Sequence, residues 1–229
     1  MSKNVSVTDS GGKTQAAPDG SRGFDADSPV SLAMAQRFAG EGYTFCLRYL
    51  SLEASAGERD LRAEEAQHIL DGGLALMPVQ HVLNAPWMPA QELGTKHGLT
   101  AAIQARAIGV PAQTNVWLDL EGVDCRANAH DVIAYCNAWY EAVASAGYLP
   151  GVYVGASCGF TGQQLYDLPF RHYWRSLSRD VPAIPVRDYQ MVQSVHDGII
   201  NGVSINLDTT SVDRCGGVPQ WWTKALDAI

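Results

Sequence analysis

The chain has 229 residues, 46% of them hydrophobic, and carries a formal net charge of −8 at pH 7. This length and apolar content suffice for one sizeable domain core. No cluster of five or more Lys and Arg residues occurs, so the sequence lacks the concentrated basic face that nucleic-acid partners require. No stretch of 18 apolar residues occurs either, so no membrane span is predicted.

Residues 1–22 predict a flexible leader, because they are rich in Ser, Gly, Lys, Asp and Thr and supply little to bury. They contain no apolar run followed by a small-residue cleavage site, so no secretory signal peptide is expected. We therefore expect a protein made in the cytoplasm, which would need a non-Sec export route or cell lysis to act outside it.

From Gly23 onward, short apolar runs alternate with segments of helical periodicity, which is typical of repeated βα units. Strands are predicted at 23–25, 44–50, 74–82, 115–120, 151–155, 172–174, 189–194 and 203–207. Helices are predicted at 31–39, 62–70, 99–108, 129–146 and 162–167. A hairpin-like turn at 196–198 joins the last two strands in place of a helix.

Repeated βα units favour parallel strands, either in an open doubly wound sheet or in a closed barrel. The number of strands and the chain length favour an α/β fold of the (β/α)₈ TIM type over residues 23–229, irregular in its last units. No glycine-rich phosphate motif follows a strand, so dinucleotide binding is disfavoured. The five cysteines form neither a CxxC pair nor a Cys/His cluster, so neither a metal nor a cofactor is expected.

Active sites of such barrels lie at the carboxyl ends of the strands. Polar or aromatic residues at the predicted ends are Asp25, Arg48, Tyr49, His81, Asp119, Glu121, Tyr153, Trp174, Gln190, Gln193 and Asp208. The strongest signal is the segment WLDLEG at 117–122, because residues two apart on a strand face the same side, about 6 to 7 Å apart. Repulsion between two carboxylates in one pocket should raise the pKa of one of them. Glycoside hydrolysis needs such a pair, with one protonated carboxyl group and one carboxylate. Alone, the Asp-x-Glu pattern also fits a solvated loop start.

Several short segments make the chain resemble the glycoside-hydrolase-like domain called DUF1906 or Rv2525c-like, which is similar to the family 25 lysozymes. They are Gly23-Phe24-Asp25, Phe45 with Arg48-Tyr49-Leu50, Asp119-Leu120-Glu121-Gly122, Gly147-Tyr148 with Pro150-Gly151-Val152-Tyr153, Tyr189-Gln190 and Asn206-Leu207-Asp208. The resemblance implies a barrel in which Glu121 is the general acid and Asp119 is the charge-stabilising or nucleophilic partner. It also implies that Asp25 and Asp208 are supporting carboxylates.

Six further residues are candidates for contacting substrate. Arg48 could hold an acidic substituent by bidentate hydrogen bonds, or pair with a neighbouring carboxylate. Tyr153 and Trp174 could stack on sugar faces, or belong to the core. His81 is a candidate contact or a hydrogen-bonded structural residue, and Tyr49 and Gln190 complete the set.

Three functions remain open from the sequence. The first is a metal-free, monomeric glycoside hydrolase that cleaves β-1,4 linkages of peptidoglycan or a related amino-sugar polymer. The second is a non-catalytic glycan-binding module on a hydrolase-like barrel. The third, an unrelated barrel enzyme acting on small metabolites, has the least support.

Overall fold

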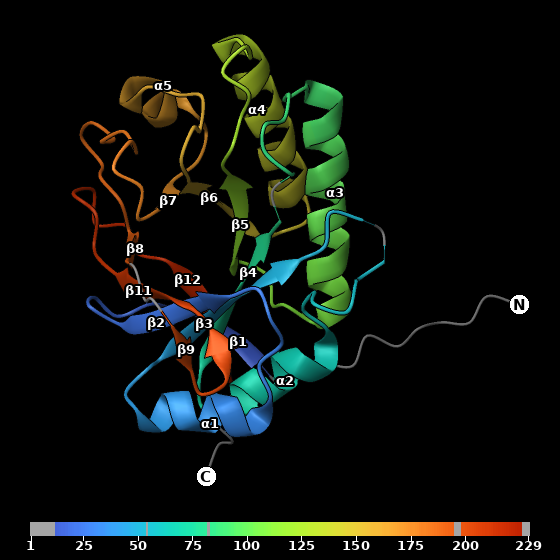
Figure 1. Ribbon diagram of the computed structural model, residues 1–229, viewed down its shortest axis with the longest axis vertical. Helices are drawn as coiled ribbons and strands as arrows, with labels where there is room; N and C mark the ends of the chain where they lie inside the picture. The colour runs from blue at the N-terminus through green and yellow to red at the C-terminus, as the bar shows by residue number, and fades with distance from the viewer. Residues whose placement is uncertain (1–11, 54, 82, 195–197, 226–229) are drawn as a thin grey trace, which may run out of the picture.

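Eight strands of the computed structural model, which describes residues 12–53, 55–81, 83–194 and 198–225, close into a barrel (Figure 1). They are β2 (Arg22–Ala26), β3 (Phe45–Leu50), β4 (Ala75–Gln80), β5 (Asn115–Leu120), β6 (Leu149–Val154), β7 (His172–Arg175), β8 (Met191–Ser194) and β11 (Asn206–Thr210). Around the barrel their order is β4, β3, β2, β11, β8, β7, β6 and β5, and β5 pairs again with β4. The predicted TIM-type barrel is confirmed.

Helices connect the parallel strands on the outside of the barrel: α1 (Leu32–Gly40), α2 (Ala63–Asp71), α3 (Gln91–Ile108), α4 (Ala129–Ser145) and α5 (Gly162–Asp167). Helix α3 begins well before the predicted start at residue 99. Gly94 and Gly98 lower helix propensity there, but a Cβ on Gly94 would lie 2.2 Å from the carbonyl oxygen of Tyr135 on α4. The glycines therefore allow α3 and α4 to pack backbone against backbone, side by side in Figure 1.

The predicted flexible leader is wrong from residue 12 onward. Strand β1 (Gly12–Ala16) pairs antiparallel with β12 (Gln220–Lys224), and Trp222 of β12 pairs with Leu76 of β4. Residues 1–11 lie outside the described part of the chain. The strand was not predictable because β1 is polar and its partner lies at the opposite end of the sequence.

The last barrel strand is antiparallel to both of its neighbours, not parallel as repeated βα units predict. Strand β11 pairs in this sense with β2 and with β8. A parallel crossover needs a dozen or more residues, usually with a helix, and the connection from β8 is too short for one. Part of that connection forms a two-stranded hairpin, β9 (Ile199–Ile200) with β10 (Val203–Ser204), so the predicted strand 203–207 divides between β10 and β11. Residues 196 and 197 of the predicted turn lie outside the described chain.

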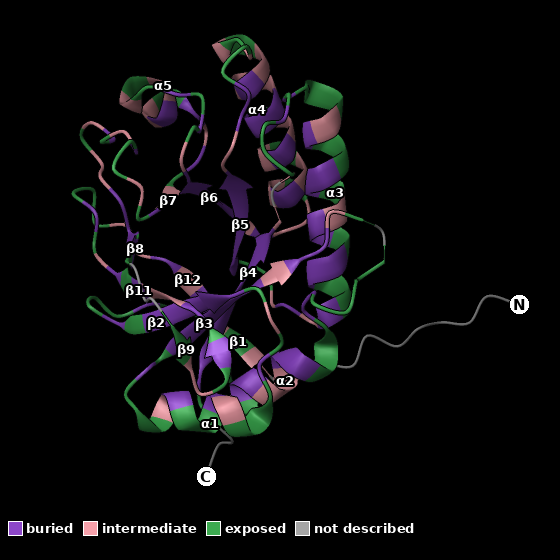
Figure 2. Cartoon of the chain, viewed as in Figure 1, coloured by how far each residue is buried: buried purple, intermediate pink, exposed green. Residues whose placement is uncertain are grey.

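Apolar side chains fill the barrel, and a second, larger apolar cluster joins its outer face to the helices. The inner cluster consists of Ala17, Phe45, Leu47, Ala75, Met77, Val79, Trp117, Tyr153, Trp174, Met191 and Trp221. Figure 2 shows the barrel strands buried and the outer helix faces exposed. No helix in the described ranges has the length and hydropathy to cross a membrane. Since the barrel is solid, substrate can reach only its ends.

Candidate active site

Alternation along β2 and β5 brings two carboxyls into one end of the barrel. Asp25 is 4% exposed and Asp119 is 6% exposed, and the side chains on either side of each pack outward against the helices. Glu121 follows β5 with the same parity, and its side chain covers Gly155, where a Cβ would lie 2.4 Å from the Cβ of Glu121. The three predicted carboxylates Asp25, Asp119 and Glu121 therefore gather at the carboxyl ends of the parallel strands, with Glu121 the most exposed.

Asp119 is the most poorly solvated of these acids. Burial raises its pKa well above the ordinary range, and the nearby charges of Glu121 and Asp25 raise it further. Its Oδ1 is buried and receives no hydrogen bond from any residue that the structure describes. Burial, the neighbouring charges and the lack of a donor to Oδ1 therefore all favour the protonated form of Asp119 over its anion.

Asp25 is also buried, but three side chains donate to it. Gln193 Nε2 lies 2.7 Å from Oδ2, while Asn206 Nδ2 and the Tyr49 hydroxyl lie 3.3 and 3.5 Å from Oδ1. Burial raises the pKa of Asp25, and the hydrogen bond from Gln193 is the largest effect that opposes it. Ionisation of Asp25 is therefore favoured by the side-chain amides of Gln193 and Asn206.

Asp208 lies deeper in the barrel than its predicted place at a strand end. It pairs with Gly23, whereas Asn206 pairs with Asp25, because antiparallel β11 starts at the mouth and runs inward. The Asp208 side chain is fully buried and accepts a 2.8 Å hydrogen bond from Trp174 Nε1. Burial, and then the charge of Asp25, raise its pKa well above the ordinary range. Asp208 can support Asp25 but cannot touch a substrate.

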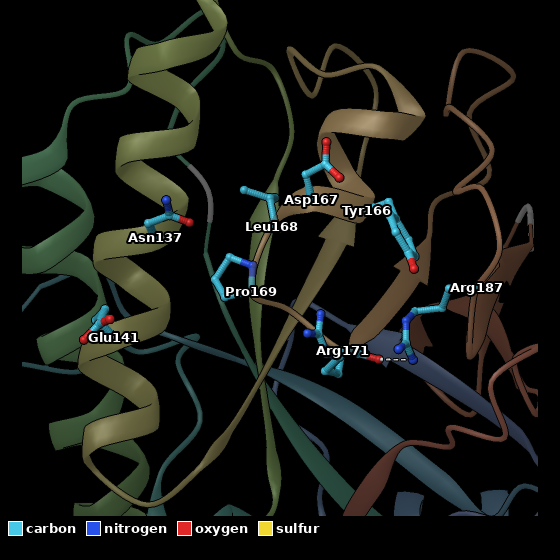
Figure 3. A pocket seen from close by; sticks show the side chains of 8 residues that line it. All are labelled: Asn137, Glu141, Tyr166, Asp167, Leu168, Pro169, Arg171 and Arg187. Atoms are coloured by element: carbon cyan, nitrogen blue, oxygen red, sulfur yellow. Dashed lines mark hydrogen bonds between the residues drawn. The ribbon is translucent and has the colours of Figure 1, made fainter.

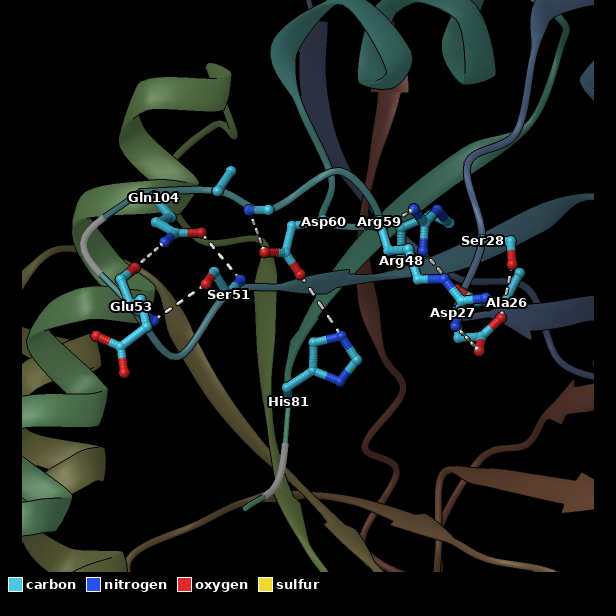
Figure 4. Close-up of polar contacts among 12 residues, drawn as sticks. Ala26, Asp27, Ser28, Arg48, Ser51, Glu53, Arg59, Asp60, His81 and Gln104 are labelled. Atoms are coloured by element: carbon cyan, nitrogen blue, oxygen red, sulfur yellow. Dashed lines mark hydrogen bonds and ion pairs between the residues drawn. The ribbon is translucent and has the colours of Figure 1, made fainter. Parts of the chain in front are cut away.

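Two predicted substrate contacts point out of the barrel and are wrong. Arg48 is fully buried between β3 and α2, where its Nε lies 2.6 Å from Oε1 of Glu65 and its Nη1 and Nη2 donate to backbone carbonyls (Figure 4). Gln190 is fully buried as well, accepting from the Tyr173 amide and donating to the Arg171 carbonyl. Strand β3 is buried on both faces, and the segment that ends in β8 carries a glutamine on each parity, so the sequence does not reveal which parity faces inward.

The predicted aromatic contacts divide between the core and the rim. Trp174 is buried inside the barrel with its ring 4.4 Å from that of Tyr153, so the core alternative holds for both. Tyr49 and His81 form the rim, with stacked rings 4.5 Å apart. The His81 side chain is 35% exposed and its Nε2 lies 3.6 Å from Oδ1 of Asp60 (Figure 4). Burial lowers the pKa of His81, so its ring is neutral at pH 7.

Two residues of the site, Gln193 and Asn206, were not among the predicted catalytic or substrate-binding residues. Gln193 stood among the polar residues of the seventh predicted strand, 189–194, and the choice there fell on Gln190, which has the opposite parity. Asn206 has the parity of Asp208 and stands in the Asn206-Leu207-Asp208 segment that carries part of the family resemblance. Both residues donate to Asp25.

A separate pocket of about 560 Å³ lies outside the barrel between α4 and the α5–β7 segment (Figure 3). It is lined by Asn137, Glu141, Tyr166, Asp167, Leu168, Pro169, Arg171 and Arg187 and contains none of the candidate catalytic residues. Arg187 is already paired with Asp213 at 2.8 Å. Within the described ranges, no three His, Cys, Asp or Glu side chains are grouped so that they could hold a metal ion.

Comparison with known proteins agrees with this geometry. The family described as Rv2525c-like, glycoside hydrolase-like domain matches residues 36–214. The Tat-secreted protein Rv2525c of Mycobacterium tuberculosis is similar in structure, with a TM-score of 0.66 at 16% identity over 88% of this chain and 98% of that one. A B. stearothermophilus protein described as uncharacterized reaches 0.65 at 20% identity over 84% and 96%.

Enzymes with the same fold are more distant. A muramidase from Trichobolus zukalii has a TM-score of 0.53 at 14% identity over 83% of this chain and 93% of that one. No curated protein matches the chain. The barrel, its carboxyl-lined mouth and the match over most of the sequence lead to one conclusion: the chain belongs to the Rv2525c-like family of glycoside hydrolase-like domains.

Proposed function

We propose that the protein is a glycoside hydrolase that cleaves β-1,4 linkages of peptidoglycan or a related amino-sugar polymer. One observation carries the proposal: Asp119 is buried beside Glu121 at the open end of the barrel, where burial and the charge of Glu121 raise its pKa. Glycoside hydrolysis requires this combination of a stored proton and a second carboxyl. The likeness in fold to muramidases and endolysins supports a glycan as the substrate.

Glu121 is the residue proposed to meet the glycosidic oxygen, because it is the more exposed member of the pair. The proton held on Asp119 passes to Glu121 and from there to the leaving oxygen as the glycosidic bond breaks. Asp119 is then an anion and stabilises the positive charge that develops on the sugar ring. Water adds to the anomeric carbon, and its proton returns to the carboxyl pair, so the site is restored.

The rim offers the sugar contacts. The stacked rings of Tyr49 and His81 present an aromatic surface beside the carboxyls, and sugar faces pack on such surfaces. The proposed substrate contacts are thus Tyr49 and His81. Arg48, Gln190 and Trp174 have no part in them.

The decisive experiment compares Glu121→Gln with the wild type on purified peptidoglycan. The variant is expected to keep the wild-type melting temperature and to release no reducing ends, because an amide cannot donate the proton. Glu92→Gln, at an exposed position in the first turn of α3, is the matched control and should retain activity. Wild-type release by Glu121→Gln would remove Glu121 from the mechanism.

A glycan-binding module is the second candidate, because Asp25 and Asp119 are each less than a tenth exposed. A wild-type protein that sediments with wall material without releasing reducing ends would support this alternative. Action as a monomer, synthesis in the cytoplasm and delivery by lysis or a non-Sec route stay predictions; gel filtration and cell fractionation would test them.

A further inference from the structure

The side-chain amide of Gln193 links two elements of the barrel mouth. Its Nε2 lies 2.7 Å from Oδ2 of Asp25 on β2. Its Oε1 accepts from the Tyr153 hydroxyl at 3.0 Å and from the Leu177 backbone N–H at 3.4 Å. Gln193 is buried, so these contacts persist without competition from bulk water.

These partners fix the orientation of the amide. The Leu177 N–H can only donate, so the group that faces it must be the amide oxygen. The NH₂ of Gln193 is therefore turned towards Asp25, and it can donate there but cannot accept. A donor of this kind stabilises the carboxylate more strongly than the protonated carboxyl group.

The three buried carboxyls receive very different numbers of donors. Asp25 accepts from Gln193, Asn206 and Tyr49, and its interaction with Asp208 also lowers its pKa, whereas Asp208 accepts from Trp174. Asp119 Oδ1 receives none within the described residues. Repulsion among crowded acids allows few of them to ionise, and the best-solvated one does so first.

We propose that Gln193 is a positioning residue that places the negative charge of the barrel mouth on Asp25 and thereby keeps the proton on Asp119. Asp25 as an anion repels a second charge at Asp119, and so the orientation of one amide decides which carboxyl stores the catalytic proton. The charge assignment stands on the contacts above. Only its consequence for catalysis rests on the proposed function.

Other polar groups face the same space and belong to the same titration. They are Tyr49 on β3, His81 after β4, Asp119 and Glu121 on and after β5, Tyr153 on β6, and Asn206 and Asp208 on β11. Among them, Asn206 and Tyr49 also donate to Asp25, but at the longer distances of 3.3 and 3.5 Å. Gln193 has the shortest contact and the one orientation that its neighbours fix.

The test is a pH titration of the side-chain carboxyl carbons by NMR, on the full chain labelled with ¹³C aspartate. Asp25→Asn and Asp119→Asn assign the two resonances. In Gln193→Met, which removes the amide at similar volume, the Asp25 midpoint is expected to move to higher pH and the Asp119 midpoint to lower pH. Gln163→Met, which removes a 2.8 Å contact from a surface glutamine to Asp167, is the matched control and should move neither midpoint.

The opposite directions separate charge placement from a merely structural role. If Gln193 only held the fold together, its loss would admit water and move both midpoints to lower pH. That result, or an unmoved Asp25 midpoint, overturns the inference. Should Gln193→Met fail to fold, Gln193→Glu keeps the size but faces Asp25 with an oxygen, and the Asp25 midpoint must again rise.

Activity gives an independent readout. If the wild type releases reducing ends, Gln193→Met should displace the pH profile of that release, because the proton on Asp119 is bound less tightly. A wild type without activity would contradict the proposed hydrolase and leave the titration interpretable. An active wild type with an unmoved Asp25 midpoint would contradict only the role of Gln193.

Discussion

The indole N–H of Trp174 points at the carboxyl group of Asp208, with Nε1 2.8 Å from Oδ1. Both side chains are buried inside the barrel, one layer below the mouth. Trp174 is the donor found for this acid, since Oδ2 receives none from the described residues. Trp174, a candidate for stacking on a sugar, therefore donates a hydrogen bond to the buried carboxyl group of Asp208 instead.

Replacing Trp174 by Phe should lower the free energy of unfolding by about 1–3 kcal/mol beyond the loss of packing, because a buried acceptor is left without its donor. Urea denaturation measures the change. Trp139→Phe is the matched control, since it removes an equally buried indole whose Nε1 donates at 2.7 Å to the neutral Oε1 of Gln80. Equal stability of Trp174→Phe and the wild type would contradict this role.

Asp119→Asn should stabilise the protein, increasingly so as the pH rises. The folded state holds the Asp119 proton above the pH at which the unfolded chain releases it, because burial raises the pKa of this group. Folding therefore takes up a proton. Protonated Asp119 contributes its full share of stability below the pKa of an unfolded aspartate, about 3.9, and this contribution is lost as the pH rises through the pKa of the folded state. Denaturation at pH 4 and pH 7 measures the effect. A variant less stable than the wild type at pH 7 would show that Asp119 is paired.

Arg48→Met should destabilise the protein by about 3–5 kcal/mol, because it leaves the buried carboxylate of Glu65 without its partner. The double variant Arg48→Met with Glu65→Gln removes both charges and should recover much of the loss. Denaturant titrations give both values. At temperatures where the variants are folded, their affinity for soluble glycan fragments should equal that of the wild type. Weaker binding by the folded double variant would restore Arg48 as a substrate contact.

Gly155→Ala should reduce glycan hydrolysis by about 10²-fold with little loss of stability. The added Cβ would lie 2.4 Å from Cβ and 2.8 Å from Cγ of Glu121, so the proposed acid must move, and small misplacements of catalytic groups have effects of this size. Rates of reducing-end release, compared at equal melting temperature, test it. Gly40→Ala, where the added Cβ meets nothing within 4 Å, should be fully active. Full activity of Gly155→Ala would argue against Glu121.

Local patterns predicted the parts of the site that local geometry controls. Asp119 and Glu121 share a parity on one strand, and this parity alone puts both at the mouth once the strand closes into a barrel. The same reasoning failed for Arg48, because β3 is buried on both faces and has no polar side to mark its orientation. It failed for Gln190 because the segment that ends in β8 has a glutamine on each parity. The place of Asp208 failed for a different reason, since it depends on the direction of a strand.

The sequence by itself determined the barrel, the carboxyl pair at the end of β5 and the absence of a basic face, because these follow from periodicity and composition within short segments. The tertiary structure alone decided that β1 joins β12, that β11 runs antiparallel, and that Gln193 and not Gln190 reaches Asp25. These features are pairings between residues far apart in the chain. Their energies depend on burial and on contacts that exist only once the barrel has closed.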